Sequence, residues 1–299
     1  MPKIIVQGDN IRLDQYLADI CHVTRSQINK TIKAGIFLNG ISVNKPSLMV
    51  KNDDVIELDI PNTEIDVVAS DDTLKILYED EYVLVIDKVQ GMVVHQSTSS
   101  RNPNTVVNAL LNYTNKLSTI DPIRMGIVHR LDKDTSGVLV IARTDEVHEK
   151  LQQAFKDRQV TRRYLGICGG ILKEKMGTVV APIGRSTSDR KKMIVMPDGK
   201  EAVTKYKVVE EFNKYSLVDF ELVTGRTHQI RVHMRHIGHP IAGDSRYGGD
   251  CKLYKYGQLL HSYYVKFTHP VTAKEVEINC QVPAYFQNIL IKLREQNSR

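Results

Sequence analysis

The first sixty residues carry a hydrophobic pattern that predicts two short helices. In residues 12–21 the apolar side chains recur at i, i+3, i+4 and i+7, the spacing that gives a helix one apolar face. These positions are Leu13, Tyr16, Leu17 and Ile20. Residues 24–35 predict a second helix, which begins at an N-cap provided by Thr24 or Ser26 and ends at Gly35.

A β-hairpin is expected after the second helix. Residues 36–46 contain two short apolar segments joined by Asn39 and Gly40. An Asn-Gly pair between two such segments is a strong hairpin signal, because both turn positions need a positive φ. Residues 53–60 predict one further strand, so this part of the chain is expected to form a small α/β domain.

The pattern divides the chain into two domains. Residues 1–60 form the predicted small domain, residues 61–72 are polar and are expected to be a linker, and residues 73–299 contain longer elements. Strands are predicted at residues 82–88, 137–144, 162–168, 204–212, 215–223 and 263–270, and helices at residues 106–117 and 145–157. The strands are rich in β-branched residues and partly alternate, which favours an antiparallel or mixed sheet over a doubly wound parallel one. The expected fold class is α+β.

Composition narrows the class of protein without defining it. Of 299 residues, 41% are hydrophobic and 25% are charged, which is typical of a folded soluble protein and excludes intrinsic disorder. No apolar run approaches the roughly 18 residues of a membrane helix, and the N-terminal segment does not have the pattern of a secretory signal. The four cysteines, Cys21, Cys168, Cys251 and Cys280, are far apart, which is typical of free thiols in a reducing cytosol.

The charge is modestly basic, with a formal net charge of +6. Its distribution is uneven, since no Asp or Glu lies between His22 and Lys51. The basic side chains of this stretch are Arg25, Lys30, Lys33, Lys45 and Lys51. They are compatible with contacts to nucleic-acid phosphates and equally with an ordinary solvated face.

Familiar cofactor motifs are absent from the sequence. There is no GxxxxGK[ST], no GxGxxG that opens a helix and no HExxH, which argues against nucleotide hydrolysis, dinucleotide redox chemistry and zinc proteolysis. Four histidines, His228, His233, His236 and His239, crowd together. Only one pair has helical ligand spacing and no cysteine pair lies nearby, so hydrogen-bonded histidines are favoured over a metal site.

The densest polar stretch is residues 126–144, in which a loop precedes an apolar strand. The loop holds His129, Arg130, Asp132, Asp134, Thr135 and Ser136. A loop that brings charged side chains to the edge of a sheet is a usual place for a site. The alternative is a turn in which an aspartate caps backbone amides.

Two further stretches are rich in basic residues. In residues 222–249, Thr227 is a candidate N-cap for a helix whose polar face carries His228, Arg231 and Arg235. An arginine there is suited to pair with a carboxylate or a phosphate, and the alternative is a solvated basic face. The polar loop at residues 184–193 carries Arg185, Arg190, Lys191 and Lys192, which suit a phosphate backbone or solvent.

These stretches together resemble the RluA family of pseudouridine synthases. GIVHRLDKDTSGVLVIA (126–142) is similar to the family's HRLDxxTSG motif, RRYLGI (162–167) to the segment with its active-site tyrosine, and residues 222–249 to its third motif. The resemblance extends from about residue 74 to about residue 285 and includes LYEDEYVLVIDK and LLHSYYVKFTHP. Four motifs in the family's order make a chance match very improbable.

The small N-terminal domain has a resemblance of its own. RLDQYLA, SQINKTIKAG and LNG resemble the alpha-L RNA-binding module of the ribosomal-protein-S-four type. A module of this type before the catalytic domain is the arrangement of RluD-type enzymes, which modify large-subunit (23S) ribosomal RNA. The resemblance therefore implies RNA binding by Arg25, Lys30 and Lys33.

The resemblance to the synthases also implies roles for individual residues. Asp132 matches the catalytic aspartate, which acts on the sugar as nucleophile or as base, and Arg231 the arginine that pairs with it. Tyr164 matches the tyrosine that packs on the uracil, Arg130 the side chain that fills the gap left by the extruded uridine, and Leu260 an apolar wall of the pocket. Extrusion is required because a stacked base hides its bond to the sugar.

Further assignments follow from the same motifs. His129 and Arg226 are assigned to substrate binding, and the loop residues Arg185, Arg190, Lys191 and Lys192 to RNA binding. The reaction rearranges one glycosidic bond without redox change or net hydrolysis, so no metal and no cofactor are expected.

The resulting hypothesis is a cytoplasmic, cofactor-independent RNA pseudouridine synthase whose partner is ribosomal RNA. Three alternatives stay open on the residues: a related synthase that acts on transfer RNA, a catalytically silent RNA-binding or ribosome assembly factor, and a hydrolase or metal enzyme built on the histidines. The second is disfavoured because Asp132, Tyr164 and Arg231 are all present.

Overall fold

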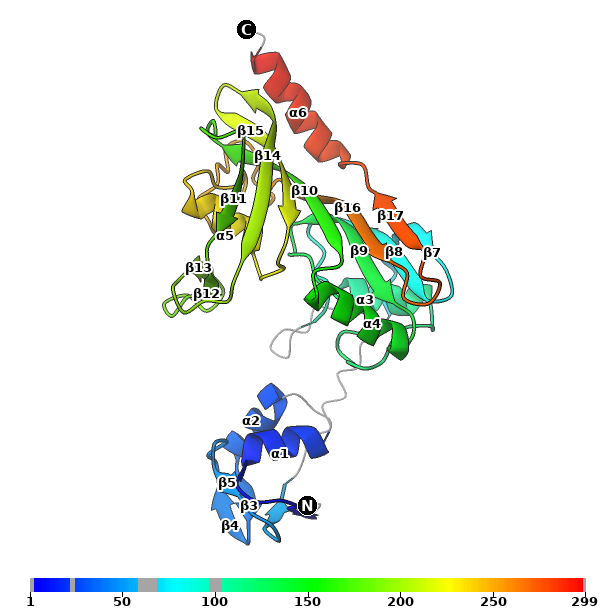
Figure 1. Cartoon of the computed structure of the whole chain (residues 1–299), viewed down its shortest axis with the longest axis vertical. Helices are drawn as coiled ribbons and strands as arrows, with labels where there is room; N and C mark the ends of the chain where they lie inside the picture. Colours follow the sequence, from blue (N-terminus) through cyan, green and yellow to red (C-terminus); the bar gives the residue numbers. More distant parts are fainter. Residues whose placement is uncertain (1–2, 22–24, 59–68, 97–103, 298–299) are drawn as a thin grey trace. The chain divides into compact units, whose positions relative to one another are not determined.

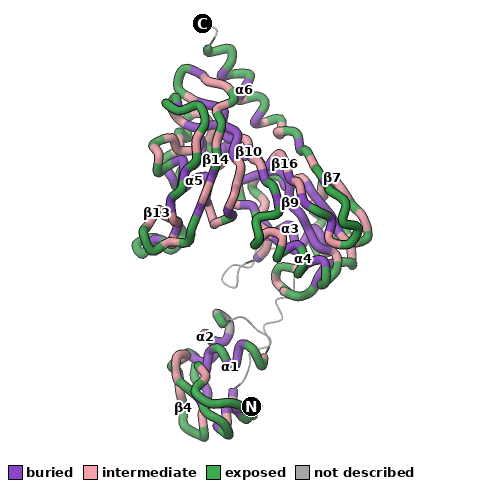
Figure 2. The backbone as a smooth tube through the Cα atoms, viewed as in Figure 1, coloured by how far each residue is buried: buried purple, intermediate pink, exposed green. Residues whose placement is uncertain are grey.

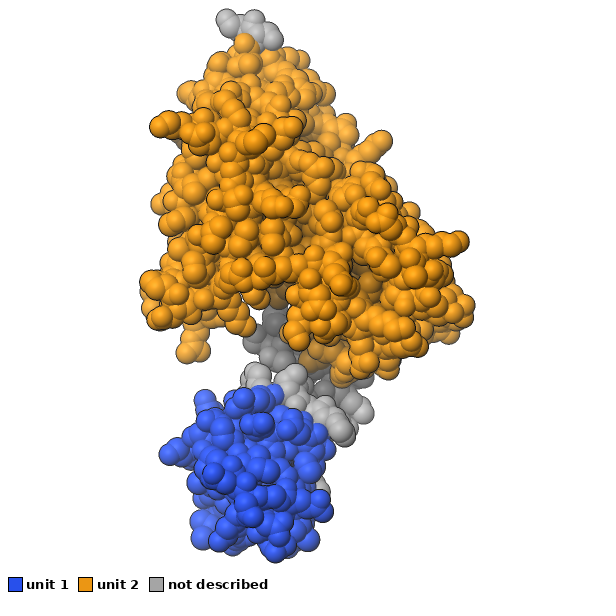
Figure 3. Space-filling model, in the orientation of Figure 1, with its two compact units in different colours: residues 1–65 blue, residues 66–299 orange. Residues whose placement is uncertain are grey.

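The computed structural model describes residues 3–21, 25–58, 69–96 and 104–297, and the chain forms two compact units. Unit 1 is Met1–Ile65 and unit 2 is Asp66–Arg299 (Figure 3). The boundary between them falls within the segment 61–72. Each unit has its own hydrophobic core, and the two are described separately.

Unit 1 is a small α/β unit built on two helices and short strands (Figure 1). Its elements are β1 (Lys3–Ile5), β2 (Ile11–Arg12), α1 (Leu13–Ile20), α2 (Arg25–Ala34), β3 (Ile36–Leu38), β4 (Ile41–Val43), β5 (Met49–Val50) and β6 (Val55–Glu57). Four strands form one sheet in the order β1-β6-β3-β4, and β2 pairs with β5. Leu13, Leu17, Ile28 and Ile32 from the two helices are buried in a common core, as the helical spacing of these residues requires.

The predicted hairpin of unit 1 is confirmed. Strands β3 and β4 pair antiparallel, with Leu38 opposite Ile41. Asn39 has φ 51° and Gly40 has φ 75°, so both turn positions take the left-handed conformation that an Asn-Gly turn provides at least strain. The short strands β1, β2 and β5 were outside the prediction, because two or three residues show no periodicity.

Unit 2 is organised around one nine-stranded sheet. Its strands are β7 (Lys75–Glu79), β8 (Val83–Lys88), β9 (Ser136–Ala142), β10 (Thr161–Gly169), β11 (Met176–Val180), β14 (Val203–Phe212), β15 (Tyr215–Leu222), β16 (Leu260–Thr268) and β17 (Glu275–Asn279). The order is β11-β14-β15-β10-β16-β9-β8-β7, and β17 pairs with β16. All pairs are antiparallel except β9 with β16. The prediction of an α+β fold with a mainly antiparallel sheet is confirmed.

Four helices and a small hairpin complete unit 2. The helices are α3 (Val106–Tyr113), α4 (Asp145–Lys156), α5 (Gln229–His236) and α6 (Ala284–Asn297), and the hairpin pairs β12 (Ile183–Arg185) with β13 (Met193–Val195). All six strands predicted for this part of the chain are present, and so are the three helices predicted at residues 106–117, at residues 145–157 and after Thr227. Helix α6 was not predicted, although Phe286, Leu290 and Leu293 have helical spacing and are buried.

The central strands are buried on both faces. On β8, Leu84 and Ile86 belong to the cluster that α3 and α5 cover, whereas Val83 and Val85 pack toward α4. Strand β9 is buried at every position, which Figure 2 shows as an unbroken run of buried backbone. A continuous apolar strand such as β9 places its N-terminal loop at a rigid edge of the sheet.

Two negative findings apply to the residues that the structure describes. Within them, no helix is long and apolar enough to cross a membrane. All four cysteines are free thiols.

Candidate active site

A cavity of about 420 Å³ lies in unit 2, lined by residues of five segments. The loop before β9 contributes residues 128–132 and Thr135, and the connection from β15 into α5 contributes residues 222–231. Arg162 and Tyr164 come from β10, Leu260 comes from β16, and the end of α4 adds Phe155 and Lys156. The seven residues assigned to catalysis or substrate binding from the sequence all line this one cavity: His129, Arg130, Asp132, Tyr164, Arg226, Arg231 and Leu260.

The loop that carries Asp132 is held in place by a buried lysine. Lys88, at the end of β8, is 1% exposed and its ammonium donates to three backbone carbonyls, those of Val89 at 2.9 Å, Met92 at 2.8 Å and Lys133 at 3.0 Å. Burial lowers the pKa of Lys88 to about 7, although the charges of Asp134 and Asp132 oppose this shift. The three bonds tie the residue next to Asp132 to the end of the neighbouring strand.

Gly137 allows this loop to enter the sheet. It has φ 108°, and a Cβ at this position would lie 2.0 Å from the carbonyl oxygen of Ser262 on the parallel strand β16. Any side chain would therefore push β9 and β16 apart. Only glycine permits the close approach that brings Asp132 near to β10 and β16.

Asp132 faces an arginine that two carboxylates share. Arg231 Nη1 donates to Asp132 Oδ2 at 2.8 Å, while its Nε and Nη2 donate to the two oxygens of Asp244 at 2.6 and 2.9 Å. Burial lowers the pKa of Arg231, but the hydrogen bonds and charges of Asp244 and Asp132 outweigh this effect and raise it. The guanidinium is thus a fixed bridge that orients Asp132 toward the cavity.

His228 and Tyr247 form a second contact to Asp132. His228 Nδ1 lies 2.8 Å from the Tyr247 hydroxyl, which accepts the backbone N–H of Met193, and His228 Nε2 lies 3.8 Å from Asp132 Oδ1. Burial lowers the pKa of His228. The tautomer in which the tyrosine hydroxyl donates to Nδ1 carries the ring proton on Nε2, on the side of Asp132.

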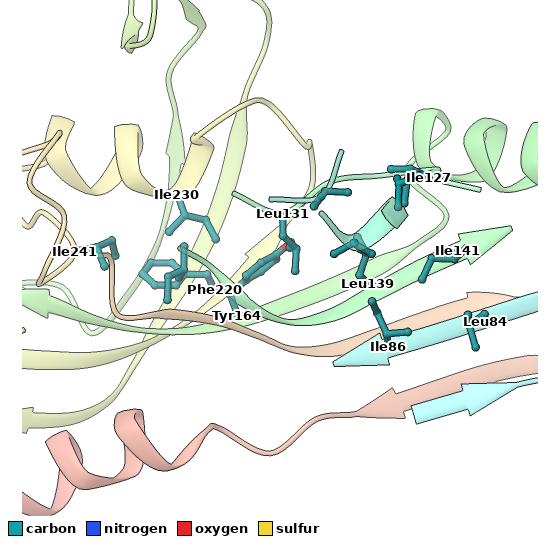
Figure 4. Packing of buried hydrophobic residues seen from close by; sticks show 14 of the residues in the cluster. Leu84, Ile86, Ile127, Leu131, Leu139, Ile141, Tyr164, Phe220, Ile230 and Ile241 are labelled. Carbon is teal, nitrogen blue, oxygen red and sulfur yellow. The ribbon is translucent and has the colours of Figure 1, made fainter. Parts of the chain in front are cut away.

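An aromatic and aliphatic wall faces these charged groups. Tyr164 is 5% exposed and Leu260 is 4% exposed, and they pack with Leu131, Phe220 and Ile230 in the main core cluster of unit 2 (Figure 4). Burial raises the pKa of Tyr164, so its hydroxyl is protonated at neutral pH. The cavity therefore combines one carboxylate with a flat apolar surface on which a planar ring can rest.

His129 supports the loop through a backbone bond. Its Nε2 accepts the N–H of Val140 at 2.9 Å, and its ring stacks on Phe155 at 4.6 Å. Burial, together with the charge of Arg162, lowers the pKa of His129 to about 3. The ring is therefore neutral, and its Nε2 is already engaged with β9.

Basic side chains outnumber acidic ones around the cavity. The lining includes six cations and one carboxylate, Asp132; the cations are Arg130, Lys156, Arg158, Arg162, Arg226 and Arg231. Arg158 pairs with Glu201 at 2.6 Å, and Arg226 Nε donates to the carbonyl of the same residue. The excess of positive charge favours an anionic substrate.

One expectation for helix α5, its N-cap, is wrong, and one alternative left open for its polar face does not apply to Arg231. The helix begins after His228, which has φ 58° and no side-chain cap bond, and not at Thr227. The side chain of Gln229 folds back instead and accepts the N–H of Arg226 at 2.9 Å. Arg231 is 7% exposed, so it does not belong to a solvated face; only tertiary packing against Asp132 and Asp244 buries it.

The remaining basic residues lie outside the cavity. Arg185, Arg190 and Lys191 are exposed on the β12–β13 hairpin, and the ammonium of Lys192 lies 5.7 Å from the ring of Tyr247. In unit 1, Lys33 is exposed, and Arg25 donates to Asp14 at 2.8 Å. The side chain of Lys30 lies outside the described part of the structure.

Three of the four crowded histidines, His228 among them, have protein partners. His233 is fully buried, and its two ring nitrogens lie 2.9 Å from the Thr204 hydroxyl and 3.0 Å from the carbonyl of Ala181. His239 bonds to the carbonyl of Gly169. Among the described residues, no group of three or more histidine, cysteine, aspartate or glutamate side chains has the geometry to hold a metal ion.

Sequence reasoning missed four residues of this site: Lys88, Arg162, Asp244 and Tyr247. Two of them left a readable signal, since Lys88 ends an apolar strand and Arg162 stands two residues before Tyr164, on the same side of β10. The importance of Asp244 and Tyr247 depends on contacts with α5 that no local pattern encodes.

Comparison with known proteins agrees with this geometry. Residues 82–236 match the family model described as RNA pseudouridylate synthase. The chain is 43% identical to ribosomal large subunit pseudouridine synthase D of Xylella fastidiosa, over 96% of this chain and 90% of that protein. It is 41% identical to the uncharacterized RNA pseudouridine synthase YlyB of Bacillus subtilis, over 95% and 94%.

A solved structure shares the fold. Human RNA pseudouridylate synthase domain containing 1 superposes with a TM-score of 0.59 at 27% identity, over 72% of this chain and 86% of that one. The protein is a pseudouridine synthase by class. The chain belongs to the RNA pseudouridylate synthase family, and its resemblance to the RluA group of that family is confirmed.

Asp244→Asn tests the shared arginine. The amide keeps the shape of the carboxylate but removes its charge, so Arg231 loses the partner that orients it toward Asp132. We expect kcat for RNA isomerisation to fall by about 10- to 100-fold, the range for one charge-assisted contact, with KM for RNA within about threefold. Asp219→Asn is the matched control, because it removes a carboxylate that pairs with Arg163 outside the cavity. Equal losses in the two variants would contradict the orienting role.

The neutral state of His129 predicts acid sensitivity. In the unfolded chain histidine titrates near pH 6.5, whereas the pKa of His129 is about 3 in the folded protein. Between these values the unfolded state binds a proton that the folded state does not, so the free energy of unfolding falls as the pH falls. His129→Gln keeps an acceptor for Val140 but does not titrate. Acidification from pH 7 to pH 5 should lower the free energy of unfolding by about 1–2 kcal/mol more in the wild type than in this variant. Urea unfolding at each pH measures this difference.

The control for this comparison is the exposed His236→Gln, which should follow the wild-type pH dependence. Parallel curves for wild type and His129→Gln would show that His129 is not held neutral.

Proposed function

We propose that this enzyme isomerises specific uridines of large-subunit (23S) ribosomal RNA, with Asp132 as the catalytic carboxylate. The observation that carries the proposal is Asp132, oriented by Arg231 at 2.8 Å, in a basic cavity beside the wall of Tyr164 and Leu260. The substrate class is supported by several relatives at 38–43% identity whose names are ribosomal large subunit pseudouridine synthase D.

The chemistry needs few groups. The bond between the ribose and the uracil nitrogen N1 breaks, the base turns, a new bond forms between the ribose and carbon C5, and the proton of C5 is lost while N1 regains one. Asp132 acts on the ribose as nucleophile or as base during this exchange. No electron is gained or lost and no water is consumed, so we expect the reaction to proceed without a cofactor.

Each remaining side chain has a role in this scheme. The uracil packs on Tyr164, which is the candidate group for transfer of the C5 proton, and Leu260 confines it on the apolar side. Arg130 is exposed at the rim, a position that suits a side chain replacing the extruded base in the RNA. Arg226 and His129 line the same cavity, the latter with its Nε2 engaged by Val140.

RNA contacts outside the cavity are assigned to two surfaces. The β12–β13 hairpin offers Arg185, Arg190, Lys191 and Lys192 to the phosphate backbone. Unit 1, proposed as an S-four-type RNA-binding domain that spans residues 1–60, offers Lys30 and Lys33, with Arg25 already paired to Asp14. We expect a cytoplasmic location, because a ribosomal RNA substrate is consistent with it.

The test of the proposed function is pseudouridine mapping. Total RNA from cells that lack this gene should lose pseudouridine at specific positions of 23S ribosomal RNA, and the wild-type gene should restore them. Asp132→Asn should restore none, because an amide neither attacks the ribose nor takes its proton. Sites lost from transfer RNA would support the alternative substrate, and restoration by Asp132→Asn would overturn the catalytic assignment.

A second experiment tests unit 1 as the RNA anchor. The logarithm of the RNA-binding constant falls linearly as the logarithm of the salt concentration rises. Each phosphate that a basic side chain neutralises adds about 0.7 to 0.9 to the steepness of this slope. Deletion of residues 1–65 should therefore weaken RNA binding and make this slope shallower, while the remaining unit still isomerises uridine at saturating RNA. Lys33→Glu with Lys45→Glu, both exposed and without an ion partner in the described structure, should reproduce part of this change.

The charge-matched control is Lys173→Glu with Lys292→Glu, two exposed residues of unit 2 that do not line the cavity. If the salt slope is equal in all four proteins, unit 1 is not the anchor and its basic residues form an ordinary solvated face.

A further inference from the structure

Arg162 is a buried cation without a counter-ion. It lies on β10, two residues before Tyr164, and is 8% exposed. Within the described residues it has no ion pair, and its buried Nε has no hydrogen-bond partner. Its guanidinium lies 5.3 Å from the centre of the Phe155 ring and faces the cavity.

Arg162 differs from three other arginines of unit 2, each of which pairs with a carboxylate. Arg231 bonds to Asp132 and Asp244, Arg143 pairs with Glu79 at 2.7 Å, and Arg163, the next residue of β10, pairs with Asp219. A buried guanidinium with no anion is costly, because desolvation of the charge is not offset by a partner. A cation–π contact with Phe155 offsets only part of this, about 1–2 kcal/mol.

Among the residues that the structure describes, no carboxylate pairs with Arg162. Its neighbours within the cavity are the neutral ring of His129, the protonated hydroxyl of Tyr164 and the backbone at Gly225. A Cβ at Gly225 would lie 2.6 Å from Arg162 Nη1, so a larger residue would displace the guanidinium. Because Gly225 has no side chain, the guanidinium of Arg162 stays open toward the cavity.

We propose that Arg162 is the binding site for a phosphodiester group next to the target uridine. The inference rests on RNA being the substrate, as proposed above. A phosphodiester fits better than a carbonyl of the uracil, because only an anion compensates the buried charge. The planar fork of arginine is suited to two oxygens of one phosphate. Every nucleotide that enters the cavity brings a phosphodiester on each side of its sugar.

This contact would help to hold the extruded nucleotide. The positive N-terminal end of α5 lies in the same cavity lining, and so does Arg226. With the phosphate fixed by Arg162 and the uracil resting on Tyr164, the ribose is positioned against Asp132. The predicted effect of losing Arg162 is therefore mainly on productive binding.

The test uses a synthetic RNA hairpin that contains the mapped uridine, made in two forms. One has natural phosphodiesters, and the other has uncharged methylphosphonates at the two linkages that flank the uridine. Pseudouridine formation is followed to obtain kcat/KM for wild type, Arg162→Met, Arg162→Lys and Arg163→Met. Arg163→Met is the matched control, since it is a neighbouring arginine whose partner is Asp219.

On natural RNA, Arg162→Met should lose about 10- to 100-fold in kcat/KM, as expected for one charge-assisted contact, and Arg163→Met less than about threefold. Arg162→Lys keeps the charge without the fork and should fall between them. On the RNA with neutral linkages, kcat/KM of the wild type should fall by a similar factor relative to natural RNA. For Arg162→Met, the change from natural to neutral linkages should lower kcat/KM little further. Equal further losses for wild type and Arg162→Met on the neutral RNA would overturn the proposal.

Two outcomes separate this proposal from its premises. A wild type that is active on natural RNA and unaffected by the neutral linkages overturns the phosphate site and leaves the proposed function standing. This comparison needs no variant, so it decides the proposal even if Arg162→Met fails to fold. A wild type with no activity on the mapped hairpin and none on intact ribosomal RNA overturns the proposed function, and this inference with it.

Discussion

The guanidinium of Arg231 joins the two halves of the site. It bonds to Asp132, which lies in the loop before β9, and to Asp244, which lies in the segment after α5. The three hydrogen bonds are 2.6–2.9 Å long. Two carboxylates around one cation leave a net negative charge, and it is the more exposed of the two, Asp132, that faces the cavity. Without this bridge a partly buried carboxylate would face the substrate with no fixed orientation.

The bridge works only because both of its ends are rigid. The end at Asp132 is fixed by three carbonyl bonds of Lys88 and by Gly137, where β9 and β16 approach too closely for any side chain. The end at Arg231 is fixed by α5, whose first turn is held by Gln229. The central strands are buried on both faces, so the edge that carries the site rests on closely packed strands.

The electrostatics of the cavity is asymmetric. Its acidic group, Asp132, is bonded to Arg231, whereas Arg162 in the same lining has no counter-ion in the described structure. An apolar wall of Tyr164 and Leu260 lies in the same lining. A ligand that matches this arrangement has an anion, a flat ring and a reacting centre between them, which describes a nucleotide within an RNA strand.

Much of this protein was determined by its sequence alone. The spacing of apolar residues along the chain predicted the central strands and the main helices, because each kind of element buries residues at its own period. The motifs around Asp132, Tyr164 and Arg231 indicated the family. The tertiary structure alone decided that Arg231 is buried between Asp132 and Asp244. It also decided that His129 accepts the backbone N–H of Val140 and that α5 begins after His228. It also left Arg162 unpaired beside Arg163, which is paired. These outcomes depend on which charges meet across segments distant in the chain, and the free energy of a charge is set by its partners and its burial, which no local pattern contains.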